Sequence, residues 1–536
     1  MSGKRLWLGP MLLLSAIALF AAAGLYAIDH ALHSAGYSDP LSHYLSFDAE
    51  MVSNSIGVLS SITAAVLGII VTVVSIVVQL AATRFTPAIT EMFLRDRTNQ
   101  IVMALYVVGC VIGFWTAFGV GSGWVPRVSL VAMLVMATLG FVVMAPYFAH
   151  VFRFLAPENV VAQLTHEAKA AAIGPQKRRT RTSAARHATT LNRTEQLTDI
   201  AINAVSQKDK IIATSAVDAL RDLTVAYLDA KSTLDPSWFE LGRTVLDNPD
   251  FASMAEASVA DIAREGTWFE FKVLRQYQSI YAEAIGTMRD INYVIAINTR
   301  LIAERAHHTD SPEALHLAIK FFNTYLRATL NAGDVRTAYT ILNQYRLMAD
   351  ALLSAGAPAL ALKIANHIKY YGHLSYDKKL GFVTETVAYD LGTLCERAHE
   401  LESPAESTLL HVFLDVDPAM SEDDLQETSL RGVRKAQIKL ATYYLVCGAE
   451  DLARTVWRDM SQESAERLHS IRDELLAVDS KDFWEISDRG ENFDYLEPER
   501  KAMLARFFGW FAEMSGELKA VSVPRAAAGR TTQGAT

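Results

Sequence analysis

The chain of 536 residues carries 50 Lys and Arg against 59 Asp and Glu, a formal net charge of −9. Residues 198–536 alone hold 36 basic and 50 acidic side chains, a net charge of −14. Contact with nucleic-acid phosphates needs clustered Lys and Arg, so this composition argues against nucleic acid as a partner. Cys110, Cys395 and Cys447 stand far apart, which gives no support for a zinc site or a disulfide framework.

Long apolar runs dominate the first 154 residues. A bilayer core of about 30 Å needs about 20 apolar residues in a helix, and four segments without Asp, Glu, Lys or Arg meet this length: 6–28, 55–83, 101–121 and 128–152. The first run is longer than a signal-peptide core, which favours a retained anchor over cleavage. Backbone groups in lipid must be paired within the chain, so we expect a domain of four membrane-spanning helices over residues 1–154.

The placement of Lys and Arg in the short loops predicts the orientation of the spans. Lys4 and Arg5 precede the first run, residues 29–54 contain neither Lys nor Arg, and residues 84–97 contain three arginines. This alternation places the N-terminus, the loop after the second run and everything beyond residue 153 in the cytoplasm.

The segment after the second run predicts a short amphipathic elbow at the cytoplasmic interface. Thr86 is a residue type that caps helices, and Pro87 suits a first helical position. Ile89, Met92 and Phe93 then recur at helical spacing. The alternative is a bare hairpin connector. The residues assigned to this elbow are Arg84, Pro87, Arg95, Asp96 and Arg97.

The second run also carries a stripe of small and polar residues at helical spacing. Such residues pack helices closely within or between subunits, as the Gly109–Gly113 pair of the third run also does. The alternative is that the stripe lines a pore, since hydroxyls and amides can line a solute path. The spans lack the charges that proton-coupled carriers place in the membrane. The candidate packing or pore-lining residues are Asn54, Ser61, Gly68, Thr72, Ser75 and Gln79.

The remaining residues predict an all-α soluble part. We expect a basic juxtamembrane connector over 155–197, a helical domain over 198–517 and a disordered tail over 518–536. Ser403-Pro404, with Glu406 following, predicts a capped helix start. Similar stretches of a small residue, Gly and a helix begin at Ala332, Ala355 and Cys447. Their intervals of 23 and 92 residues do not fit the tetratricopeptide period of about 34, so we expect a repeat-like array of no named type.

Motifs that carry catalysis or cofactor binding are missing from the sequence. We find no phosphate loop of the GxxxxGK[ST] kind, no GxGxxG, no HExxH and no GxSxG in a supporting context. We therefore expect no catalytic residue, no cofactor and no metal, and we do not expect an enzyme.

A resemblance to a known family appears in two segments. Residues 59–109 resemble the bacterial predicted membrane proteins of domain of unknown function 2254, and residues 194–206 are a weaker match. In the second segment the family continues with a Ser-Pro-Ala-Ile-Asn-Asp-Pro pattern, where this chain has "SQKDKII". The resemblance implies four spans and a cytoplasmic domain in a bacterial inner membrane, and supplies no activity. The matching residues are Gln79, Leu80, Ala81, Phe85, Pro87, Phe93, Leu94, Arg95, Asp96 and Arg97.

Two hypotheses for function follow. The first is a membrane-anchored interaction or scaffold protein, a homo-oligomer in the bilayer whose helical cytoplasmic domain binds a protein partner. The second is an oligomeric channel or passive transporter lined by the second span.

Overall fold

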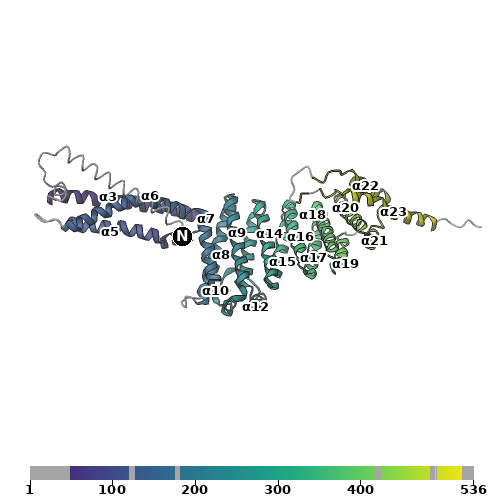
Figure 1. Cartoon of the computed structure of the whole chain (residues 1–536), viewed down its shortest axis with the longest axis horizontal. Helices are drawn as coiled ribbons and strands as arrows, with labels where there is room; N and C mark the ends of the chain where they lie inside the picture. The colour runs from purple at the N-terminus through teal and green to yellow at the C-terminus, as the bar shows by residue number, and fades with distance from the viewer. Residues whose placement is uncertain are drawn as a thin grey trace, which may run out of the picture. The chain divides into compact units, whose positions relative to one another are not determined.

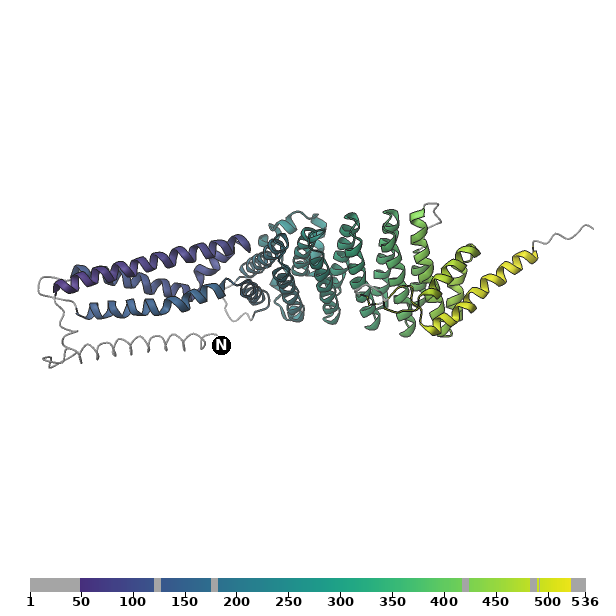
Figure 2. The same ribbon diagram turned by 90° about the horizontal axis from the view of Figure 1, so that it is seen from above.

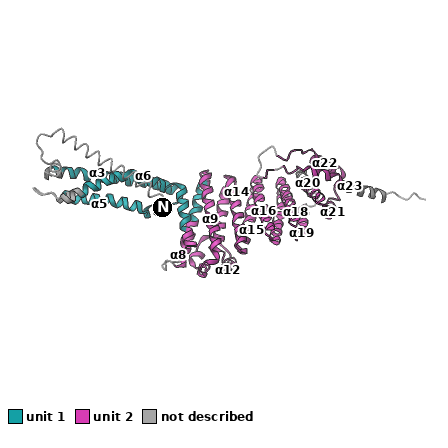
Figure 3. Cartoon of the chain, in the orientation of Figure 1, with its two compact units in different colours: residues 1–167, 195–204 teal, residues 168–194, 205–536 magenta. Residues whose placement is uncertain are grey.

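The computed structural model describes residues 49–119, 127–174, 182–416, 424–482, 489–490 and 492–521. All the secondary-structure elements assigned in these ranges are helices, and Figure 1 labels most of them. The predicted first span, residues 6–28, lies outside the described residues. The chain divides into two compact units, residues 1–167 with 195–204 and residues 168–194 with 205–536 (Figure 3).

The first unit contains three helices that are long and apolar enough to cross a membrane: Asn54–Arg84, Arg97–Trp115 and Ala132–Phe154. They correspond to the second, third and fourth expected spans. Tyr106 donates a hydrogen bond of 2.6 Å to the carbonyl oxygen of Gly140 on the neighbouring helix. The helices of this part are α3 (Ala49–Arg84), α4 (Ala88–Arg95), α5 (Arg97–Gly119) and α6 (Arg127–Phe154).

The GxxxG pair of α5 lies in helix contacts inside the protomer. A Cβ atom on Gly113 would lie 2.5 Å from the Ser60 hydroxyl of α3, and one on Gly109 would lie 3.7 Å from the Met136 side chain of α6. The absence of a side chain at Gly113 therefore allows α5 and α3 to approach closely, as small residues do in membrane helices.

Helices α7 (Pro157–Ala172) and α8 (Ser183–Ser206) occupy the predicted connector. Most of the second unit is an array of helices in two layers (Figures 1 and 2). One layer contains α9 (Lys210–Ala230), α14 (Arg289–His308), α16 (Val335–Ser354), α18 (Gly381–Glu400) and α20 (Asp424–Val446). The other contains α13 (Trp268–Ala284), α15 (Pro312–Asn331), α17 (Pro358–Asp377), α19 (Glu406–Leu414) and α21 (Glu450–Asp459).

Shorter elements and the last two helices complete this unit. Helix α23 continues past residue 518, where the predicted tail begins, and residues 522–536 lie outside the described residues. These elements are η1 (Lys231–Thr233), η2 (Pro236–Trp238), α10 (Arg243–Leu246), α11 (Pro249–Ala252), α12 (Glu256–Glu265), α22 (Ala465–Ala477) and α23 (Pro498–Val521).

The array has a regular repeat of one helix. Helices α14 to α18 are each 20 residues long and begin at residues 289, 312, 335, 358 and 381, every 23 residues. The intervals of 23 and 92 residues between the similar sequence stretches are therefore one and four of these units. Because neighbouring helices alternate between the layers, equivalent positions in one layer are 46 residues apart.

A left-handed residue follows each helix of this repeat and ends it, because this conformation satisfies the last helical carbonyls and redirects the chain. Gly333 and Gly356 adopt this conformation without steric cost. The equivalent turns use residues with side chains, which conceals the repeat in the sequence. Those residues are Asp310, Lys379 and Glu402, with φ of 51°, 59° and 49°.

The predicted helix start at Ser403-Pro404 is confirmed in part: the Ser403 hydroxyl accepts a 3.3 Å hydrogen bond from the Ala405 backbone, but the helix begins two residues after Pro404 and the capping box with Glu406 is not formed. Helix α19 begins at Glu406, and Ala405 stands at its N-cap position without a side-chain cap. The Glu406 carboxylate instead lies 2.6 Å from Nδ1 of His399, near the end of the preceding helix. The contact with His399 has therefore replaced the local contact between Glu406 and Ser403 that the capping box predicts.

Candidate functional site

The predicted stripe on α3 lies on the exposed side of that helix among the described residues. Its opposite side, which includes Ile70, Val74 and Val78, is buried. The Ser61 and Thr72 hydroxyls each donate 2.8 Å hydrogen bonds to the carbonyl four residues earlier, so they need no partner outside the helix. The exposed residues are Asn54, Ser61, Gly68, Thr72, Ser75 and Gln79.

The segment predicted as an elbow contains the amphipathic helix α4. Ile89, Met92 and Phe93 are buried, whereas Arg95 is exposed and pairs with Glu91 at 2.6 Å. Pro87 stands at the N-cap position, one residue before the first helical position expected for it. A bare connector does not describe this segment.

The remaining elbow residues flank α4. Arg84 is the last residue of α3 and lies over the Phe85 ring, and Arg97 begins α5. Asp96, between α4 and α5, accepts a 2.9 Å hydrogen bond from the Asn99 backbone and lies 2.9 Å from Nε2 of His150 on α6.

A second polar contact strengthens this corner. Tyr147 donates a 2.7 Å hydrogen bond to Oδ1 of Asn99, and Nδ2 of Asn99 donates to the carbonyl oxygen of Phe93. Asn99 and Tyr147 are both buried, so these bonds satisfy polar atoms that water cannot reach. The corner between α4 and α5 is thereby held against α6.

The two segments that carry the family resemblance meet in the first unit. Asn203 of α8 donates a 2.7 Å hydrogen bond to the carbonyl oxygen of Phe85, at the end of α3. A cavity of about 630 Å³ lies beside this contact, and Ser75, Gln79 and Asn203 are among its lining residues. Gln79 thus lies at the edge of a cavity.

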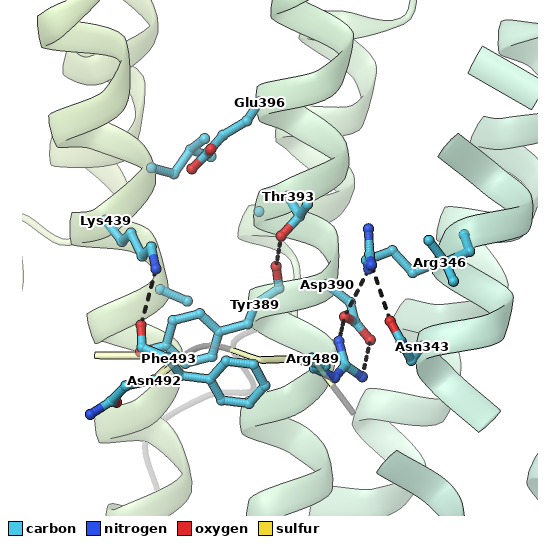
Figure 4. A pocket seen from close by; sticks show the side chains of 14 residues that line it. Asn343, Arg346, Tyr389, Asp390, Thr393, Glu396, Lys439, Arg489, Asn492 and Phe493 are labelled. Carbon is cyan, nitrogen blue, oxygen red and sulfur yellow. Dashed lines mark hydrogen bonds and ion pairs between the residues drawn. The ribbon is translucent and has the colours of Figure 1, made fainter. Parts of the chain in front are cut away.

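A second candidate site, which sequence reasoning missed, crosses three helices of the array. We call Arg489–Gly490 and Asn492–Asp494 the docked segment, and the surface of α16, α18 and α20 beneath it the groove. Arg489 donates to both carboxylate oxygens of Asp390 on α18, with Nη2 to Oδ2 at 3.1 Å (Figure 4). Its Nη2 also donates to the carbonyl oxygen of Tyr339 on α16.

The other end of the docked segment contacts α18 and α20. The Phe493 ring stacks on Tyr389 with centroids 4.4 Å apart, and Lys439 donates a 3.2 Å hydrogen bond to the Phe493 carbonyl oxygen (Figure 4). Asp494 accepts hydrogen bonds from the Tyr389 hydroxyl at 2.8 Å and from Lys435 at 2.7 Å. Both side chains and backbone of the segment are therefore recognised.

The groove is built on the repeat. Asn298, Gln344 and Asp390 are buried at equivalent positions of α14, α16 and α18, 46 residues apart. Arg300 donates to Gln344 at 2.9 Å, and Arg346 lies 3.5 Å from Asp390. Each arginine thus bridges to the next helix of its layer, and the last bridge ends on a carboxylate instead of an amide.

A titratable group lies next to the docked segment. Burial, and next the nearby Asp494 carboxylate, raise the pKa of Glu385 on α18 from 4.5 to about 7, although Lys435 acts in the opposite direction. Among the described residues, no group of three or more His, Cys, Asp and Glu side chains is arranged to hold a metal ion.

Comparisons with known proteins agree with the membrane part of this description. Residues 3–196 match the family described as predicted membrane protein (DUF2254), so the resemblance is confirmed over that region. No curated protein is significantly similar to the chain. One solved structure, a circular tandem repeat protein with novel repeat topology and enhanced subunit contact surfaces, shows 12% identity over 88% of this chain and 99% of that chain, with a TM-score of 0.25. A likeness that weak carries no argument.

Proposed function

We propose that this protein is a membrane-anchored interaction protein without catalytic activity. The spans hold it in a bacterial inner membrane, and the helical array lies in the cytoplasm, where its groove binds a protein partner. One observation carries this proposal: the groove holds a looped segment of polypeptide across three helices, through side-chain and main-chain contacts. Repeat arrays present this kind of extended binding surface, because equivalent positions recur along one layer.

Photocrosslinking in cells tests partner binding. A photoreactive amino acid at Thr393, which lines the cavity beside the docked segment, is expected to give a discrete adduct above the mass of the protomer. The matched control is the same amino acid at Asn366, an exposed position on α17 in the other layer. Equal adducts from both positions, or none from Thr393, would contradict the proposal.

The cytoplasmic location has its own test. Arginines in the loop after α3 and Lys4-Arg5 at the start of the chain support cytoplasmic termini. Alkaline phosphatase fused after Thr536 is expected to be inactive, because that enzyme requires the periplasm to fold. An active fusion would place the array on the wrong side of the membrane.

The second candidate function is an oligomeric channel, and the exposed stripe on α3 favours it. In such an oligomer the α3 helices of the subunits would present Ser61, Thr72, Ser75 and Gln79 to a common axis. Replacing Ser75 and Gln79 together by Leu is expected to abolish ion flux in liposomes, whereas Ile69→Leu, at an exposed apolar position of the same helix, leaves it unchanged. Flux that is absent from the native protein, or unchanged by the double substitution, excludes the channel.

A further inference from the structure

We infer that the docked segment is an internal occupant of a peptide-binding groove and that it shows the chemistry of the partner. That partner segment has an Arg followed four residues later by an aromatic residue and then an acidic one, and it binds in a turned conformation like that of residues 492–495. This inference rests on the proposed function and specifies what the groove recognises. It follows from three contacts, each of which selects one kind of side chain.

The first contact selects a cation. Asp390 is 1% exposed, and its repeat equivalents, Gln344 and Asn298, are neutral amides. A buried carboxylate is costly unless it is fully paired, and the bridging guanidinium of Arg346 stays 3.5 Å away. Arg489 forms the second ion pair with Asp390, which is bidentate, and the Arg489 side chain is only 8% exposed. A guanidinium matches both oxygens of a carboxylate, which an ammonium group does not.

The second contact selects an aromatic ring and also holds the backbone of that residue. The rings of Phe493 and Tyr389 are inclined by 14° and stack. Lys439 holds the carbonyl oxygen of the same residue, a contact that any amino acid at this place offers. Main-chain contacts give affinity and side-chain pockets give specificity in peptide recognition.

The third contact selects an acid. The two carboxylate oxygens of Asp494 have separate donors, Tyr389 on α18 and Lys435 on α20. Lys435 also pairs with Glu474 at 3.0 Å, which holds the ammonium group in place. The order of cation, aromatic ring and acid therefore follows the order of α16, α18 and α20 beneath the segment.

The groove also extends beyond its present occupant. A cavity of about 400 Å³ remains beside the segment, and Asn343, Arg346, Thr393 and Glu396 line part of it (Figure 4). A partner segment with additional polar side chains thus has contacts that the docked segment does not use. The docked segment competes as part of the same chain, with an effective concentration of the order of millimolar.

A peptide-binding experiment on the full-length protein in detergent tests the inference. The probe is a fluorescein-labelled peptide with the sequence of residues 487–497, SDRGENFDYLE. The variant Arg489→Ala/Phe493→Ala removes the internal competitor, and we expect it to bind the probe at least tenfold more tightly than the native protein. Adding Asp390→Asn, which restores the amide type found at Gln344, is expected to weaken binding at least tenfold.

The controls separate recognition from general effects. Asp415→Asn removes an exposed carboxylate that pairs with Lys369 in the other layer, and it should leave binding to the released variant unchanged. A scrambled peptide of the same composition should not bind. If the double variant does not keep the native circular dichroism spectrum, Arg489→Lys/Phe493→Leu replaces it, with the same expected direction.

Two results would overturn the inference: equal binding of the probe to native and released protein, or no binding to a folded released variant. The outcome is independent of the crosslinking test above. A partner adduct without peptide binding defeats the inference and leaves the proposed function standing. Peptide binding without any cellular adduct contradicts the proposed function and leaves the specificity of the groove for this segment standing.

Discussion

Replacing Glu385 by Gln should stabilise the helical array above neutral pH. The Glu385 carboxyl lies in a largely buried position on α18 near Asp494, and its pKa is raised from 4.5 to about 7 by burial and then by that neighbouring charge. The folded protein therefore holds the Glu385 proton more tightly than the unfolded chain does. The glutamine amide keeps the side chain neutral at every pH.

The sign and size follow from this difference. The stabilisation from tighter proton binding is complete below about pH 4.5, decreases as the pH rises towards 7 and is lost above that. The interval between 4.5 and about 7 corresponds to roughly 3 kcal/mol, at about 1.4 kcal/mol for each pH unit. Above pH 7 the variant should therefore exceed the native protein in stability by as much as this amount.

Urea unfolding of full-length protein in detergent, followed by circular dichroism at pH 5 and pH 8, measures the effect. Glu385→Gln should give a higher unfolding midpoint than the native protein at pH 8 and a smaller difference at pH 5. Glu283→Gln, at an exposed position on α13, is the matched control and should not change the pH dependence. A gain of equal size at both pH values, or a loss at pH 8, would refute the reasoning.

Three further substitutions test packing and buried hydrogen bonds. Gly372→Ala would place a Cβ 2.8 Å from a methyl group of the buried Val387, so thermal stability should fall by about 1–3 kcal/mol as α17 and α18 separate. Gly509→Ala on α23 meets no atom within 4 Å and should raise stability by about 0.5–1 kcal/mol, and a loss there would contradict the helix-propensity argument. Tyr147→Phe leaves Oδ1 of the buried Asn99 without its 2.7 Å hydrogen bond and should lower stability in detergent by about 1–2 kcal/mol, whereas the exposed Phe141→Leu should have little effect.

The sequence by itself determined the features that depend on local physics. An apolar run of sufficient length must form a helix in lipid, and three of the four predicted runs are such helices, while residues 6–28 lie outside the described part of the chain. The amphipathic period after Pro87 likewise predicts α4, because the spacing of Ile89, Met92 and Phe93 places them on one face of a helix, and that face is buried.

The repeat shows how local patterns can be concealed. Gly333 and Gly356 mark two of its turns in the sequence, because glycine is the residue type that indicates a left-handed conformation. Asp310, Lys379 and Glu402 adopt the same conformation, but their residue types do not indicate it. The period of 23 residues is therefore visible in the helix bounds and not in the residue types at the turns.

Only the tertiary structure decided the groove. Arg489 and Asp390 are 99 residues apart, and no local rule connects a cation near the end of the chain with a carboxylate inside α18. The stacking of helices every 46 residues in one layer places Asp390 after two neutral amides. The returning chain adds the bidentate guanidinium of Arg489 to the Arg346 contact at 3.5 Å. Such a site depends on burial and distance, which are properties of the folded array.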